Sequence, residues 1–153
     1  MRRPPAKNRR GAVAVETAII ALVFLTLVLG MLELSIAVFR YNIVSQGARQ
    51  AARLAIVRGE LAPPKLDEWG PATYTSGANS GNAVTETIKP YLTGLDLDNT
   101  TITIEWLDGS TKLQDRVHVT IVTSHEVFLP FVANMLSSST FALRADSTMQ
   151  ITH

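Results

Sequence analysis

GAVAVETAIIALVFLTLVLG, residues 11–30, is almost entirely apolar and contains one carboxylate, Glu16. Residues 17–32 carry no charged side chain, and the apolar character resumes after Glu33 and continues to Phe39. A helix needs about 20 apolar residues to cross the roughly 30 Å hydrocarbon core of a bilayer. The stretch therefore predicts a transmembrane helix with a carboxylate near its start.

A basic segment precedes this helix. The first ten residues, MRRPPAKNRR, contain five of the 14 Lys and Arg residues and none of the 13 Asp and Glu residues. Lys and Arg favour the cytoplasmic side of a membrane helix. We therefore expect residues 1–11 to form a leader in the cytoplasm and the C-terminal part to lie outside the inner (cytoplasmic) membrane. Because the remaining chain is mildly acidic, we expect no nucleic-acid partner.

The helical pattern continues beyond the apolar stretch. YNIVSQGARQAARLAIVRG, residues 41–59, contains good helix formers, and no proline follows until Pro63. A helix over residues 12–58 is about 70 Å long, which is about twice the thickness of the hydrocarbon core. The part outside the membrane must therefore pack against something else.

The rest of the chain predicts a loop over residues 59–82 and a small α+β domain over residues 83–153. The loop segment is rich in Gly, Pro, Ser and Asn. A short helix is expected after Asn82, a possible cap, with Gly94 as its stop and Pro90 limiting its last turn. One face of that helix is predicted to carry Val84, Ile88, Tyr91 and Leu92.

Three segments alternate apolar and polar residues and predict a roughly three-stranded antiparallel sheet with one buried face. The apolar positions are Ile102, Ile104 and Trp106, then Val117, Val119 and Ile121, and finally Phe141, Leu143, Ala145, Met149 and Ile151. Between the last two segments lies the apolar run VFLPFVANML, residues 127–136. Pro130 excludes it from a central strand, so a buried turn, a short helix or an exposed contact patch remain open.

Neither catalytic nor metal-binding patterns are found. The chain has no cysteine, which excludes disulfides, thiolate nucleophiles and zinc-thiolate sites. His118, His125 and His153 are scattered without the spacing of a metal site, and His118 falls on the polar face of its strand. We therefore expect a protein without enzymatic activity, metal or cofactor.

Gly11, Ala12 and Glu16 have the spacing of a prepilin processing site. If the chain is cut after Gly11, Glu16 becomes the fifth residue. The sequence RRGAVAVE, residues 9–16, together with GARQAARLA, residues 47–55, and the C-terminal strands resembles the TadE-like pseudopilins. These are minor pilins of the tight-adherence (Tad, or Flp) pilus system. One departure is Thr17, where the family commonly has an aromatic residue.

The resemblance implies a structural subunit for pilus assembly. Its implied partners are the membrane, the prepilin peptidase that cuts after Gly11, the pilus assembly platform proteins, the major Flp pilin and a sister minor pilin. A major pilin of this type is far shorter, which favours a minor role.

Physical chemistry suggests why a carboxylate would stand at this place. An unpaired carboxylate in hydrocarbon is unfavourable and usually has a partner and a function. Cleavage would create the α-amine of Ala12, which lies one helical turn, or about 6 Å, from Glu16. Glu16 is expected to neutralise its own N-terminus or that of a neighbouring subunit. In the second case, charge compensation would set the register of assembly. The alternative is a hydrated Glu16 at the cytoplasmic interface.

Four further residues are candidate subunit contacts: Glu33, Arg40, Arg49 and Arg53. We expect Glu33 to be a solvated end near the outer interface, with a contact to a subunit's arginine such as Arg40 as the alternative. The arginines could equally form a solvated side of an exposed helix.

Two other functions remain open. The first is an uncleaved, membrane-anchored binding domain. The second is a secreted domain cut after Ala37, because Ser35-Ile36-Ala37 offers the small residues that signal peptidase requires. The first residue of the mature protein distinguishes all three.

Overall fold

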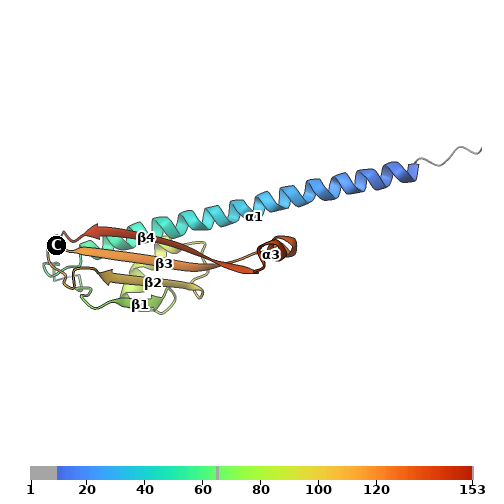
Figure 1. Cartoon of the computed structure of the whole chain (residues 1–153). Coiled ribbons are helices and arrows are strands. Elements are labelled where there is room, and N and C mark those ends of the chain that lie inside the picture. The colour runs from blue at the N-terminus through green and yellow to red at the C-terminus, as the bar shows by residue number, and fades with distance from the viewer. Residues whose placement is uncertain (1–9, 65, 153) are drawn as a thin grey trace, which may run out of the picture.

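Helix α1 dominates the structure. The computed structural model describes residues 10–64 and 66–152 (Figure 1). Most of the predicted leader, residues 1–9, lies outside the described residues, as does His153. α1 runs without a break from Arg10 to Ile56, a length of 47 residues. A small α+β domain follows it, so the predicted fold class is confirmed.

The C-terminal half of α1 packs on its own domain. The fully buried residues Val44, Ala48, Ala51 and Ala55 recur every three or four positions and form one stripe along the helix. In the apolar N-terminal half, by contrast, no residue of the most apolar window is buried. The predicted surplus of helix outside the membrane is therefore accounted for, because it packs on the sheet.

The sheet has four antiparallel strands in the order β1 (Tyr74–Gly77), β2 (Thr100–Trp106), β3 (Arg116–Glu126) and β4 (Thr140–Gln150). The last three were predicted. The short edge strand β1 lies in the segment that we expected to be a loop and pairs with β2, with Tyr74 opposite Ile104. Its four residues, YTSG, are too few and too polar to give a strand pattern.

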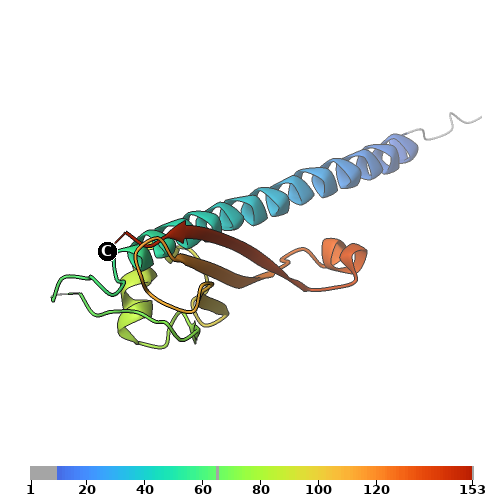
Figure 2. The same cartoon turned by 60° about the vertical axis from the view of Figure 1, so that its left-hand side comes forward.

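The predicted apolar face of the sheet is buried in β2 and β3, whereas Phe141, also predicted on this face, is 36% exposed in β4. Each predicted apolar residue of β2 and β3 is at most 6% exposed: Ile102, Ile104, Trp106, Val117, Val119 and Ile121. In the register of the sheet, Ile104 lies opposite Val119 and Ile121 lies opposite Ala145. α1 covers this sheet along β3 and β4 (Figures 1 and 2).

The short helix divides into two parts, α2 (Ala83–Ile88) and the 3₁₀ turn η1 (Lys89–Leu92). Ile88 and Leu92 are buried as predicted, whereas Tyr91 is 45% exposed.

The side-chain cap that we expected at the start of α2 does not form. Asn82 is at the N-cap position, but its side chain makes no capping bond. Its Nδ2 atom donates to the Tyr74 hydroxyl at 3.0 Å. Pro90 lies within η1, where the α-helix has ended.

At Gly47, α1 lies very close to the domain. A Cβ atom there would lie 2.6 Å from Cδ2 of Leu92 and 3.5 Å from Cδ1 of Ile121. The small residues of the segment GARQAARLA thus allow the helix to lie directly on η1 and β3. This gives a physical reason for the small residues that carried part of the family resemblance.

A hairpin tip projects from the sheet along α1 toward its N-terminal half (Figure 1). β3 and β4 are joined there by α3, Pro130–Leu136. Pro130 begins the helix, where its missing N–H is tolerated. Of the three structures considered for residues 127–136, the short helix is confirmed. Phe128 and Leu136 in this run are also exposed, at 60% and 53%.

Candidate functional site

The predicted processing residues lie in the first turns of α1, away from the domain. Gly11, Ala12 and Glu16 are all exposed, and a Cβ atom at Gly11 would meet nothing within 4 Å. Among the described residues, no ion pair includes Glu16. A protease or a neighbouring subunit can therefore approach this end of the helix without displacing any described part of the chain.

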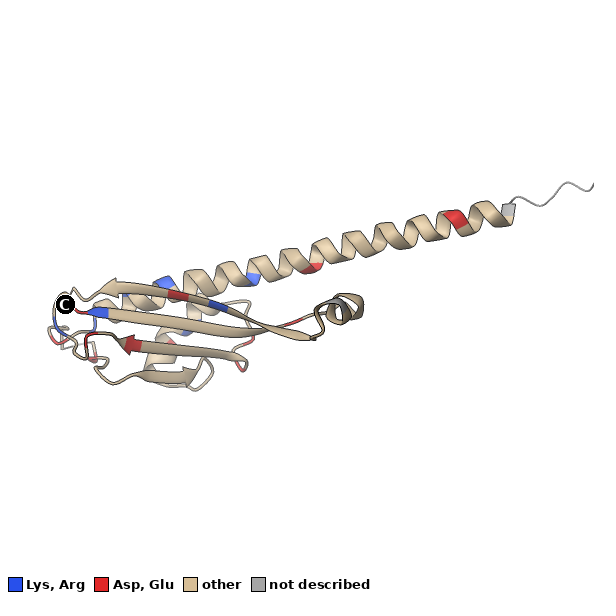
Figure 3. Cartoon of the chain, viewed as in Figure 1, with Lys and Arg blue, Asp and Glu red and all other residues tan. Residues whose placement is uncertain are grey.

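The helix between Glu16 and Glu33 is suited to lipid. Figure 3 shows a long uncharged section there, which corresponds to residues 17–32. Its hydroxyl groups bond within the helix: Thr17 Oγ1 donates to the Val13 carbonyl at 2.9 Å, and Thr26 Oγ1 to the Leu22 carbonyl at 2.8 Å. The polar side chains therefore need no water, as a membrane span requires.

Glu33 is not the solvated end that we expected from the sequence. It is only 6% exposed, and its Oε1 atom lies 3.3 Å from Nε2 of His125, which is fully buried at the end of β3. The same oxygen accepts a bond from the backbone N–H of Phe128 at 3.3 Å. The hairpin between β3 and β4 covers this carboxylate because the domain packs along α1.

Arg40 completes a chain of three side chains. Its Nη1 atom lies 3.1 Å from Nδ1 of His125. Because a guanidinium can only donate, Nδ1 is the acceptor, and the proton of a neutral ring is assigned to Nε2, which donates to Glu33. The imidazole of His125 thus bridges the carboxyl group of Glu33 and the guanidinium group of Arg40. We call this the Glu33–His125–Arg40 triplet.

Aromatic rings enclose the triplet. The Phe141 ring lies 4.8 Å from the His125 ring between centroids, and the Phe128 ring lies 6.4 Å from it, edge to face. The Arg40 guanidinium carbon is 5.8 Å from the Phe128 centroid. The rings limit access of water, which strengthens the hydrogen bonds and makes an unpaired partner more costly.

Arg49 and Arg53 are on the outer side of α1. Both are exposed, whereas Ala48, Ala51 and Ala52 beside them are buried against the domain. Arg49 Nη2 donates to Ser45 Oγ at 3.3 Å, and within residues 10–64 and 66–152 neither arginine forms an ion pair. The two side chains, four residues apart, share one accessible cationic surface.

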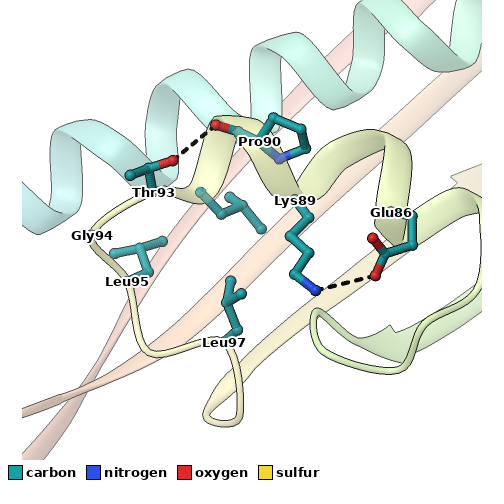
Figure 4. A pocket seen from close by; sticks show the side chains of 8 residues that line it. Glu86, Lys89, Pro90, Thr93, Gly94, Leu95 and Leu97 are labelled. Carbon is teal, nitrogen blue, oxygen red and sulfur yellow. Dashed lines mark hydrogen bonds and ion pairs between the residues drawn. The ribbon is translucent and has the colours of Figure 1, made fainter.

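One cleft of the domain, on the side of the short helix, carries no sign of chemistry. A shallow cleft of about 390 Å³ lies beside η1 (Figure 4). Its charged groups, Lys89 and Glu86, pair with each other at 3.2 Å, and the remaining lining includes Leu95 and Leu97. Within the part of the chain that the structure describes, no three His, Asp or Glu side chains are grouped to hold a metal ion.

Sequence reasoning missed His125. The signal was present, because His125 continues the odd-numbered positions of β3 that carry Val117, Val119 and Ile121 on the buried face. Extended by four residues, the same alternation places this histidine against α1. Its partners, 92 and 85 positions away in the sequence, had no local signal.

Residues 11–53 match the family described as TadE-like protein. The match supports the resemblance over residues 11–53, which include Gly11, Ala12, Glu16, the apolar helix and most of GARQAARLA, while the C-terminal strands lie outside it. No curated protein and no solved structure matches the chain. Among the described residues, α1 is the one helix that is long and apolar enough to cross a membrane.

Proposed function

We propose that the chain is a TadE-like minor pilin, a structural subunit for assembly of a Tad/Flp-type pilus that a prepilin peptidase cuts after Gly11. One observation carries the proposal. The family match begins at Gly11, at the free start of a helix whose apolar half contacts no other part of the described chain except near the hairpin tip. A long apolar helix with its domain at the far end is suited to pack among other such helices.

Glu16 has the proposed assembly role. Cleavage places the Ala12 α-amine one helical turn, about 6 Å, below this carboxylate. Because the Glu16 side chain is exposed, it is accessible to the amine of a neighbouring helix. In hydrocarbon, a pair between two subunits compensates both charges only when these subunits are aligned, so such a pair sets the register of packing.

The domain end supplies further proposed contacts. Arg49 and Arg53 face away from the sheet and can reach a neighbouring subunit. Glu33 and Arg40, which the sequence also offered as subunit contacts, are held by His125 within the chain. We propose that their first role is to fix the domain on α1, so that neighbouring subunits meet a rigid rod.

Cleavage after Ala37 is disfavoured by the packing of α1. The helix is continuous through Ser35 and Ala37, and Ala37 lines a cavity together with Glu33 and His125. A cut there would remove Glu33 from a buried histidine. It would also separate the domain from the anchor on which it lies.

We place the proposed subunit in the inner membrane as a single-pass protein, with the leader in the cytoplasm and the domain outside. From there it would enter the pilus with the help of the assembly platform proteins, beside the major Flp pilin and a sister minor pilin. Its role would be structural and not enzymatic. An uncleaved, anchored binding domain is the second candidate, because α1 alone also satisfies that role.

The test of assembly compares Glu16→Ala with Thr17→Ala in cells that lack the native copy. We expect both variants to insert into the membrane and to be cut normally. Glu16→Ala is expected to lose most of its incorporation into pili, measured by immunoblot of sheared pili, while Thr17→Ala keeps it. Normal incorporation of Glu16→Ala would overturn the proposed register.

A further inference from the structure

The hairpin tip, residues 127–141, exposes a cluster of large apolar side chains. Phe128 is 60% exposed, Phe131 39%, Leu136 53% and Phe141 36%. No residue from Val127 to Leu143 carries a charge. A contiguous apolar patch of this kind on a protein surface marks a contact with a partner or a membrane.

The tip lies beside the apolar part of α1. A Cβ atom at Gly30 would be 3.9 Å from Cζ of Phe131, and a groove of about 500 Å³ runs between Phe131 and Val132 on one side and residues 26–34 of α1 on the other. Figures 1 and 2 both show α3 alongside the helix beyond the end of the sheet. The tip therefore overlaps the segment that the membrane must contain.

The uncharged sections of α1 and of the hairpin tip end at the same level. On α1 the uncharged section ends at Glu33, and on the hairpin it begins after Glu126. These positions lie at a similar level along α1, because His125, next to Glu126, contacts Glu33. On the returning strand, Arg144 is exposed and lies about 10 Å beyond Phe141.

The depth of the tip follows from the length of α1. If the hydrocarbon core begins near Ala12, about 20 residues bring its outer boundary to residues 31–32. Residue 26, where the groove begins, is then about 9 Å inside that boundary. Amphipathic interfacial helices are buried to a similar depth of about 5–10 Å.

Part of the backbone of the tip is hydrogen-bonded within the chain. The ladder between β3 and β4 continues to the pair Glu126 and Thr140, after which the N–H of Val127 donates to the Ser139 carbonyl at 2.9 Å. The N–H of Ser138 donates to the Ala133 carbonyl at 3.1 Å and closes the end of α3. Bonds of this kind reduce the cost of placing a loop in the outer leaflet.

We propose that the hairpin tip inserts into the outer half of the bilayer beside α1, with Phe131 and Leu136 in contact with lipid chains. The domain then has two membrane attachments and a fixed orientation. The inference rests on α1 spanning a membrane and does not need the pilus. A subunit that leaves the bilayer must withdraw both elements.

Spin labels at single introduced cysteines test the insertion, because the native chain has no cysteine. The full chain in nanodiscs of phosphatidylethanolamine and phosphatidylglycerol would carry a label at Phe131→Cys or Leu136→Cys. Leu25→Cys in the apolar half of α1 and Leu107→Cys, which is 47% exposed after β2, are the membrane and water references. The measurement is the ratio of collision rates with oxygen and with a water-soluble nickel chelate.

We expect the ratio at both tip positions to be several-fold higher than at Leu107→Cys and to approach that at Leu25→Cys. A ratio equal to that at Leu107→Cys would overturn the inference while leaving α1 in the membrane. Spectral broadening between labelled tips that disappears on dilution with unlabelled chain would assign the patch to a second copy and would also overturn it. A low ratio at Leu25→Cys would contradict the membrane span itself.

Discussion

Oε1 of Glu33 on α1 lies 3.3 Å from Nε2 of His125 at the end of β3, and both side chains are buried. This contact joins the C-terminal end of the uncharged section of α1 to the end of β3, next to the hairpin tip. The triplet also contains Arg40, on the far side of the ring. The triplet therefore fixes the position of the domain along α1 by hydrogen bonds of specific geometry. Apolar packing alone would allow the domain to slide along the helix.

Removal of the carboxylate is expected to destabilise the domain. Glu33→Ala leaves the Nε2–H of His125 and the N–H of Phe128 without an acceptor, which costs about 1–3 kcal/mol. Glu33→Gln keeps an acceptor oxygen and is expected to lose less. Thermal unfolding of the full chain in detergent, followed by near-ultraviolet circular dichroism, measures both. Equal stability of Glu33→Ala and the native chain would contradict a structural role for the triplet.

The close approach at Gly47 gives a second prediction. Gly47→Leu places a large side chain where even a Cβ atom would lie 2.6 Å from Leu92, and overpacking of this kind costs about 1–3 kcal/mol. Gln46→Leu, on the exposed neighbouring position, is the matched control and is expected to change stability little. The same unfolding measurement applies. A Gly47→Leu chain as stable as the control would show that α1 does not pack this tightly.

Acid titration tests the turn between β2 and β3. Arg116 donates to Asp108 from Nη2 at 2.7 Å and from Nε at 3.1 Å. These side-chain bonds, with the backbone N–H of Arg116, lower the pKa of Asp108 from 3.8 to about 2. Since the folded pKa is the lower one, the stabilisation from this group is present above about pH 3.8 and is lost as the pH falls through about 2.

The carboxyl carbon shift of Asp108 in nuclear magnetic resonance spectra reports this titration directly. We expect a midpoint near 2 in the native chain and a higher midpoint in Arg116→Ala, which lacks the guanidinium. The same midpoint in both chains would show that the bond to Arg116 does not form in solution.

The elements with regular patterns could be predicted from the sequence. The uncharged run to Leu32 and the alternation through Ile104 and Val119 specify a helix and strands because burial requires those periods. The edge strand beginning at Tyr74 has no such pattern, since its pairing with β2 depends on backbone bonds and not on apolar side chains. The predicted processing residues were recognised by the basic leader, by the spacing of Gly11 and Glu16 and by the family resemblance.

The triplet was hidden for a different reason. Glu33 interrupts an apolar helix, and the sequence around it predicts a solvated carboxylate at the end of the membrane span. Its burial follows from the helix stripe, because positions 33, 37, 40 and 44 continue the buried face of residues 48, 51 and 55. Only the docking of β3 on α1 brings His125 to this stripe, and docking across 92 residues has no local signal.

Processing can be separated from folding by a change at Gly11. Because a Cβ atom there would meet nothing within 4 Å, Gly11→Leu is expected to fold and insert as the native chain does. It is expected to remain uncut, since the peptidase implied by the resemblance requires a small residue before the cut. An immunoblot of membranes shows precursor and mature forms as two bands. A mature band at the native yield would locate the cut elsewhere.

The most direct test of the account is the intact mass of the native chain isolated from its membrane. The account predicts a loss that matches residues 1–11, with or without a methyl group on the new N-terminus at Ala12. Cells without the prepilin peptidase would yield the uncut mass as the control. A full-length mass from normal cells, or a chain that begins at Val38, would contradict the proposed pilin.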